Sequence, residues 1–298
     1  TKRGWLAPDD LPPAQAGDQE ELADFEAVKS WKNLALRRAF EGFLANASAE
    51  DKATFDGFCK QESAWLEPFA VFTAILRDQQ ERLFLEWPTP LKMGDPAAVA
   101  EARKRLSAEI AYAQFEQWVF FFQWDALKAY AASKDVKLIG DLPIFVALNS
   151  ADVWQHPELF QLDANRNPVA VAGVPPDYFS DIGQLWGNPL YLWSAHIKQK
   201  FAWWIERIKV ALRTADLVRV DHFRGFEAYW SIPTPAENAI KGEWKPGPDH
   251  LFFQQLKDVL GDVPIIAEDL GIITPEVEKL RDDFKLPGMK ILQFAFAG

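Results

Sequence analysis

The chain has 298 residues, 49% of them apolar and 25% charged, which is ordinary globular usage and enough length for one α/β barrel or two smaller domains. Its formal charge is −11 and no basic block stands out, so we expect no nucleic-acid partner. One cysteine, Cys59, excludes a disulfide framework, and no apolar run approaches the roughly 18–20 residues that cross a bilayer. We therefore expect a cytoplasmic protein without a membrane segment.

The first half of the chain predicts helices. Apolar residues recur there at helical spacing, and Ser48 followed by acidic residues is typical of a helix start. The predicted helices are 24–45, 48–61, 63–79 and 97–133, with a loop at 86–96. In the last helix, a stripe of Ala111, Phe115, Trp118 and Phe122 is expected to face the core.

From Val136 onward, short strands alternate with helices. The predicted strands are 136–146, 215–223, 262–271 and 288–296, and the predicted helices are 194–213, about 250–260 and one that begins at Thr274 with Pro275 in its first turn. Such alternation indicates βα units and a parallel sheet.

Three of these strands run into an acidic residue. Asp141, Asp221 and Glu268 follow the apolar runs of successive strands. Carboxyl ends of parallel strands form the active-site rim in barrels and in open α/β sheets, although a single acid there, such as Asp141, could also be a helix N-cap. Three converging acids repel one another unless a cation, a shared proton or a charged substrate holds them.

The same residues suggest a division of chemical roles. Strand alternation puts Arg219 and Asp221 on one face, where the arginine favours an ionised, nucleophilic carboxylate. Glu268 follows an apolar run, and burial raises the pKa of a carboxyl as a general acid requires. This is the pairing of a retaining glycosidase, with carboxyls ~5–5.5 Å apart, a distance that neighbouring strands can provide. Arg224 is expected to make a structural ion pair.

Residues 171–191 are expected to form a long functional loop. The segment combines Gly and Pro with Tyr178, Phe179, Trp186, Asn188 and Tyr191 and shows no helical or strand period. Aromatic rings stack on the apolar faces of sugars, so the loop points to carbohydrate.

Two further hypotheses use the same features. The three acids could ligate Mg²⁺ with His222 as the base, as in enolase-type barrels. The groove could also bind glucan without turning it over.

Four motifs in order resemble the 4-α-glucanotransferases, the amylomaltase or disproportionating-enzyme family 77 of glycoside hydrolases in the α-amylase clan. They are "GDLPIFV…SADVW", "VAGVPPDYFSDIGQLWGNPLY", "RVDHFRGFEAYW" and "AEDLGIITPEVEKLRDDFKLPGMKILQFAF". The resemblance is dense from Gly140 to Phe296 and looser over 1–135, where "LEPFAVFTAI" and "QWVFFFQWDALKAYA" carry it.

The resemblance implies a fold and a reaction. The fold is a partial (β/α)₈ barrel at 95–298, with about strands three to six, preceded by a helical insertion subdomain at 1–94. The reaction is a retaining transfer of α-1,4-glucan segments between malto-oligosaccharides or to glucose, without cofactor or metal; an α-glucan hydrolase of the same clan is the alternative. The oligomeric state stays open.

The resemblance also implies roles for single residues. Asp221 matches the nucleophile, Glu268 the acid/base and Arg219 the arginine that holds the nucleophile. The residues matched to substrate binding are Asp141 near the donor glucose, His222, Asn188, Asp269, Phe294, and Tyr178, Phe179 and Trp186 in a loop that covers the acceptor side. Such a cover disfavours water and favours a sugar hydroxyl as the attacking group.

The sequence departs from the family pattern in three places. Leu148 and Asn149 stand where many relatives have an acid or His-Asp, no "PTSLPG"-like segment is found, and the chain ends before a "GTHDN"-like segment that carries a third carboxylate. We therefore expect a segment of a longer protein, cut at both ends, with weak or no transfer activity by itself.

Overall fold

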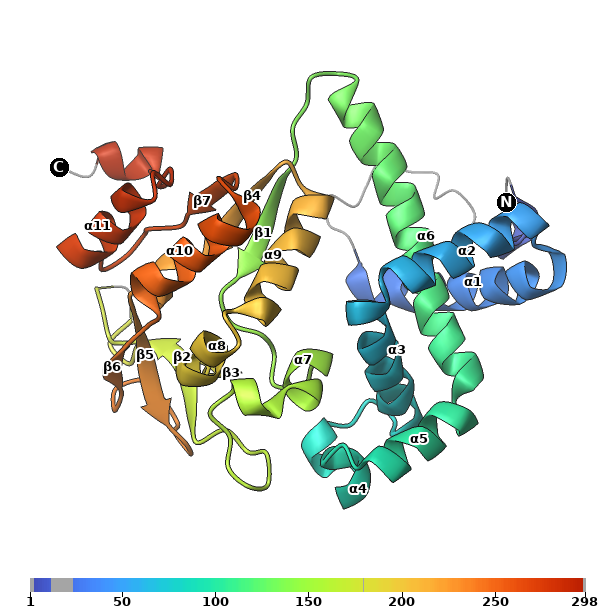
Figure 1. Cartoon of the computed structure of the whole chain (residues 1–298), viewed down its shortest axis with the longest axis horizontal. Helices are drawn as coiled ribbons and strands as arrows, with labels where there is room; N and C mark the ends of the chain where they lie inside the picture. The colour runs from blue at the N-terminus through green and yellow to red at the C-terminus, as the bar shows by residue number, and fades with distance from the viewer. Residues whose placement is uncertain (1–2, 12–23, 179, 297–298) are drawn as a thin grey trace. The chain divides into compact units, whose positions relative to one another are not determined.

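The computed structural model describes residues 3–11, 24–178 and 180–296, which form an α/β structure (Figure 1). The chain divides into two compact units, Thr1–Glu81 with Pro96–Gln123, and Arg82–Asp95 with Trp124–Gly298. The units interleave along the sequence, whereas a single boundary near residue 94 was expected.

The first unit is helical. Ser48 caps a helix as predicted, because its side chain accepts a hydrogen bond from the Asp51 amide. The predicted helix 97–133 is in fact two helices, since the backbone turns at Leu106 after three basic residues that suit a helix end. The helices are α1 (Phe25–Asn46), α2 (Ala49–Gln61), α3 (Ser63–Asp78), α5 (Pro96–Arg105) and α6 (Ser107–Ala132), of which α6 continues into the second unit.

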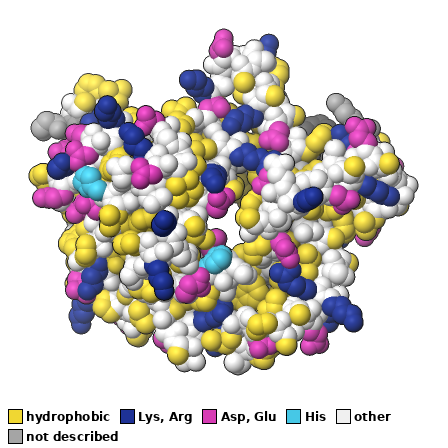
Figure 2. All heavy atoms as spheres, viewed as in Figure 1, with side chains coloured by type: hydrophobic (Ala, Val, Ile, Leu, Met, Phe, Trp, Pro, Cys, Tyr) yellow, Lys and Arg dark blue, Asp and Glu magenta, His cyan; other side chains and the backbone are white. Residues whose placement is uncertain are grey.

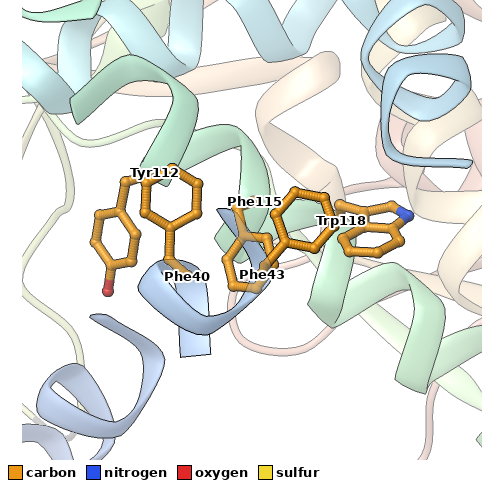
Figure 3. Close-up of a cluster of buried hydrophobic side chains, with 5 residues drawn as sticks. All are labelled: Phe40, Phe43, Tyr112, Phe115 and Trp118. Atoms are coloured by element: carbon orange, nitrogen blue, oxygen red, sulfur yellow. The ribbon is translucent and has the colours of Figure 1, made fainter. Parts of the chain in front are cut away.

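An aromatic cluster forms the core of the first unit (Figure 3). Helix α1 supplies Phe40 and Phe43, and α6 supplies Tyr112, Phe115 and Trp118, each at most 5% exposed. The predicted core stripe is thus confirmed for Phe115 and Trp118. It is wrong for Phe122, which is 50% exposed, because the buried face of α6 follows steps of three residues from 112 to 121 rather than reaching 122.

The second unit contains a three-stranded parallel sheet in the order β1-β4-β7. The strands are β1 (Ile139–Pro143), β4 (Leu217–Asp221) and β7 (Ile265–Ala267), and Asp141 is paired with Arg219 across β1 and β4. Three predicted strands and their parallel arrangement are therefore confirmed. Helices α9 (Ala202–Thr214) and α10 (Asp249–Leu260) precede β4 and β7, and α11 (Pro275–Asp283) starts after Thr274 as predicted.

Two predicted elements are wrong in this unit. The helix 194–213 is broken into α8 (Trp193–Lys198) and α9, because Lys200 and Phe201 adopt left-handed backbone angles. The segment 288–296 is not a strand. The residue before it, Pro287, accepts a hydrogen bond from the Ala267 amide of β7, and Leu292–Phe296 forms a 3₁₀ helix instead of a strand.

A second sheet was missed from the sequence. It is antiparallel, with the order β3-β2-β5-β6, and includes two strands inside the segment expected to be an irregular loop. Its strands are β2 (Ala170–Val174), β3 (Gln184–Pro189), β5 (Ala228–Pro233) and β6 (Glu243–Pro246). The glycines, the prolines and a register shift between Val171 and Gly173 hide the alternation that marks a strand.

Short elements complete the described chain. They are α4 (Thr89–Lys92), α7 (Ala151–Gln155) and 3₁₀ turns at Pro8–Asp10, Phe84–Glu86, Pro157–Leu159 and Phe223–Phe226. No helix among the described residues is long and apolar enough to cross a membrane. Figure 2 shows acidic and basic side chains interspersed over the visible face, without a continuous basic patch there.

The aromatic cluster makes a stability prediction. Phe43→Ala should lower the free energy of unfolding by about 3–5 kcal/mol, because it leaves a cavity among packed rings. Leu44→Ala, on the next residue of the same helix and 59% exposed in the wild type, should change it by less than about 1 kcal/mol. Urea denaturation followed by tryptophan fluorescence measures both, and equal effects would contradict the packing described.

Candidate active site

Arg219 connects two carboxylates on neighbouring strands, Asp141 within β1 and Asp221 at the carboxyl end of β4. Its Nε and Nη2 donate to the two oxygens of Asp141 on β1, each at 2.9 Å. Its Nη2 also lies 3.0 Å from Oδ1 of Asp221, at the end of its own strand. The prediction that Arg219 and Asp221 share a face is thus confirmed. Asp141 lies within β1 and pairs with Arg219, so it is not a helix N-cap.

The arginine reduces the repulsion expected among the acids. Its planar fork binds Asp141 with both oxygens, a geometry that a lysine cannot provide. The hydrogen bond to Asp141, together with the charges of Asp221, Asp141 and Glu268, raises the pKa of Arg219, so the guanidinium stays charged. A positive charge therefore stands between the two aspartates.

Glu268 follows β7 and is held by two backbone amides. The amide of His222 donates to Oε2 at 2.8 Å, and the amide of Leu270 donates to Oε1 at 3.0 Å. Burial, with a smaller contribution from the charge of Asp221, raises the pKa of Glu268, whereas the two amides and Arg219 oppose this shift. The raised pKa predicted from the apolar neighbours is thus confirmed in direction, with burial as its cause.

His222 directly follows β4 in a left-handed backbone conformation, φ 54°. Its ring stands edge-on to Trp186, with the centroids 4.8 Å apart, and its Nε2 is buried without a hydrogen-bond partner among the described residues. Burial and the charge of Arg224 lower the pKa of His222 to about 4, so the ring is neutral near pH 7. Gly225 lies close to the ring, since a Cβ there would lie 3.2 Å from Cδ2 of His222 and 2.7 Å from Cδ1 of Ile144.

The predicted aromatic segment is built on β2 and β3. Trp186 in β3 is 37% exposed and its Nε1 donates to Gln184, while Tyr178 between the strands is 96% exposed. The Asn188 side chain donates to the Val146 carbonyl at 2.9 Å and so ties β3 to the segment after β1. Phe179 lies outside the described residues.

The two remaining residues predicted to bind substrate are Asp269 and Phe294. The Asp269 side chain is 2% exposed and pairs with Arg281, and it also accepts from the Met289 amide at 2.7 Å. The Asp269 carboxylate thus faces the backbone near residue 288 rather than solvent. The side chain of Phe294 lies outside the described part of the structure.

Arg224, expected to make a structural ion pair, has several partners. It lies 4.0 Å from Glu227, its guanidinium covers the ring of Trp244 at 3.9 Å, and it donates to the Ile272 carbonyl. These contacts were not predictable from the sequence. They join Arg224 to strand β6 and to the segment after Glu268, and no sequence motif indicates that these distant segments meet.

Two observations concern metal ligands and cavities near this site. Among the residues that the structure describes, no group of three or more His, Cys, Asp or Glu side chains could hold a metal ion. A cavity of about 350 Å³ is lined by Leu217, Pro264 and Ile265, which lie at the amino ends of β4 and β7. It therefore opens at the end of the sheet opposite to Asp221 and Glu268.

Comparison with known proteins shows the family to which the chain belongs. The family model described as 4-alpha-glucanotransferase matches residues 2–298. The chain belongs to this family. It is 48% identical to a 4-alpha-glucanotransferase from Thermus thermophilus over 99% of the chain and 58% of that protein, and 45% identical to one from Synechocystis over 99% and 59%. The chain thus spans a little over half the length of the curated relatives it matches.

A solved structure supports the same assignment. The amylomaltase from Streptococcus agalactiae in complex with acarbose superposes with a TM-score of 0.92 at 39% identity, covering 98% of this chain and 59% of that one. A second amylomaltase, from Corynebacterium glutamicum, shares the fold with a TM-score of 0.70.

The environment of Glu268 makes a pH prediction. A glutamate whose pKa is raised by folding stabilises the folded state at pH values below the ordinary pKa of a glutamate, about 4.3. This stabilisation is lost as the pH rises through the pKa of the carboxyl in the folded state. Glu268→Gln cannot ionise, so its free energy of unfolding relative to wild type should increase between about pH 4 and pH 7.

Urea titrations at successive pH values measure this difference. Glu237→Gln, which replaces an exposed glutamate, is the matched control. A difference for Glu268→Gln that stays constant or falls with pH would contradict the burial of this carboxyl.

Proposed function

We propose that the chain carries the nucleophile and the acid/base of a retaining 4-α-glucanotransferase that moves α-1,4-glucan segments between malto-oligosaccharides or to glucose. The observation that carries this proposal is the pairing of one carboxylate bound by an arginine, Asp221, with one partly buried carboxyl of raised pKa, Glu268. Family membership supports the same reaction.

The proposed reaction has two steps. Asp221 attacks the anomeric carbon while Glu268 gives its proton to the departing glycosidic oxygen, which leaves a glucan ester on Asp221. Glu268, now ionised, takes the proton of an incoming sugar hydroxyl, whose oxygen displaces Asp221 and restores the α linkage. Arg219 holds the nucleophilic carboxylate in place, and burial raises the pKa of Glu268, the direction that a general acid requires.

We propose that β1, β4 and β7 are neighbouring strands of a partial (β/α)₈ barrel and that the helical unit near the amino end is an insertion. The parallel order and the acids at the strand ends support a barrel, because residues there form the active sites of such enzymes. The similarity to the Streptococcus agalactiae amylomaltase supports it as well.

Transfer rather than hydrolysis requires that water be kept away from the ester. Tyr178 and Trp186, with Phe179 between them in the sequence, are proposed to cover the acceptor sugar with aromatic surface. His222 and Asp141 are also proposed to contact the substrate, with Asp141 near the donor glucose, because they lie directly after β4 and on β1, respectively, beside the proposed nucleophile and its arginine. An α-glucan hydrolase with the same carboxylates is the second candidate.

A magnesium enzyme and a glucan-binding module have less support. In the magnesium hypothesis, a cation would lie among the three acids, but the arginine fork already binds Asp141 and Asp221. In the binding-module hypothesis, the raised pKa of Glu268 would have no role. Full activity in excess EDTA would rule out the magnesium reaction.

The reaction is tested with maltotriose and the full-length protein, with products separated by chromatography. Wild type should give glucose and a ladder of longer maltodextrins, whereas Asp221→Asn should lower kcat at least about 10³-fold and still bind acarbose. Asp258→Asn, on the exposed face of α10, should leave the ladder unchanged.

Three outcomes would contradict this proposal. Glucose and maltose without longer products would show a hydrolase. Binding without any products would show a glucan-binding module, and normal turnover by Asp221→Asn would remove the nucleophile assignment.

A further inference from the structure

Arg224 is a buried cation three residues beyond Asp221. Only 6% of the residue is exposed, its guanidinium lies 3.9 Å from the centre of the Trp244 ring, and it donates through Nη1 to the carbonyl of Ile272. The nearest acidic partner, Glu227, is 4.0 Å away, so the ion pair is loose. The main contacts of Arg224 thus reach two other segments of the chain, strand β6 and the turn after Glu268.

The contacts of Arg224 link the two backbone segments that bind the Glu268 carboxylate. The two amides that hold its carboxylate belong to His222 and Leu270. His222 is two residues before Arg224, and Leu270 is two residues before Ile272. The hydrogen bond from Arg224 to the Ile272 carbonyl therefore joins the two segments two residues after the amides that bind the carboxylate.

We propose that Arg224 is a positioning residue for Glu268, which fixes the distance between the His222 and Leu270 amides so that both can bind its carboxylate. The importance of this geometry for turnover rests on the proposed function. The bonds themselves and their effect on Glu268 do not, because they are properties of the folded chain.

Arginine suits this position for a physical reason. A guanidinium stacks flat on an indole ring and donates in its own plane, so Trp244 fixes the direction in which Nη1 points. A lysine keeps the charge but has no planar face to stack and no fixed donor direction. Arg224→Lys therefore separates the geometry of this residue from its charge.

The charged groups near Glu268 stay in place when Arg224 is changed. Asp221 and Arg219 are the charged groups that affect the pKa of Glu268, and both lie on β4. The charge of Arg224 acts on the ring of His222, whose pKa it helps to lower, and Arg224→Lys preserves that charge. A change in the titration of Glu268 in this variant therefore reports on the amide geometry rather than on a lost charge.

The test is residue-resolved amide hydrogen exchange by NMR on the folded protein, combined with a ¹³C titration of the Glu268 carboxyl. In Arg224→Lys, the amides of His222 and Leu270 should exchange about tenfold faster. The pKa of Glu268 should rise further, since amide bonds favour the ionised carboxylate.

Arg166→Lys is the matched control. Arg166 is also a buried arginine, and it donates to the Trp154 carbonyl at 2.7 Å and to the Met93 carbonyl at 2.6 Å, with no contact to Glu268 among the described residues. Arg166→Lys should leave the two amides and the Glu268 titration unchanged.

A second variant covers the case in which Arg224→Lys does not fold. Trp244→Leu keeps Arg224 but removes the ring that directs it, at a residue that is already 39% exposed. It should change both readouts in the same direction and by less.

Unchanged exchange and titration in the variant that folds would overturn the proposal. Equal acceleration of amides throughout the chain would overturn it as well, because that pattern shows general destabilisation. Neither readout requires catalysis, so a failure here is distinct from a failure of the proposed transferase activity.

Discussion

The bridge from Arg219 to Asp141 and Asp221 is the interaction on which the site depends. Two neighbouring carboxylates on adjacent parallel strands repel each other, and this arginine lies against both and binds one of them through both of its oxygens. The residues on β1 and β4 are paired in register, so the strands themselves set the position of the guanidinium. A cation built into β4 therefore holds the Asp221 carboxylate at the carboxyl end of this central strand.

The second carboxyl, Glu268, is held by backbone amides in a partly buried position rather than by a cation. Its burial after β7 raises its pKa. The two amides that grip it limit this effect, and they orient the carboxylate as well. One strand thus ends in a carboxylate bound by an arginine, and the next ends in a carboxyl whose pKa is raised by burial, an arrangement that suits the proposed retaining transfer.

Much of this arrangement was predictable because it depends on the strand period. Alternation placed Arg219 beside Asp221, and the apolar run before Glu268 indicated its burial. Features that depend on distant backbone were not predictable. The antiparallel sheet around β2 and β5 is assembled from short, glycine-containing strands, and the 288–296 segment has an apolar strand pattern although it forms no ladder. The backbone amides that bind Glu268 could not be predicted either, because nearly every residue has such an amide.

The central claim is that Asp221 is the group that becomes covalently bonded to sugar. It is tested most directly by mixing the full-length protein with an activated α-maltotriosyl fluoride, quenching in acid and measuring the masses of peptic peptides. We expect a maltotriosyl ester on the peptide that contains Asp221, and no ester on the peptides that contain Asp141 or Glu268. An ester on either of those residues, or rapid product formation with no ester at any carboxylate, would contradict the claim.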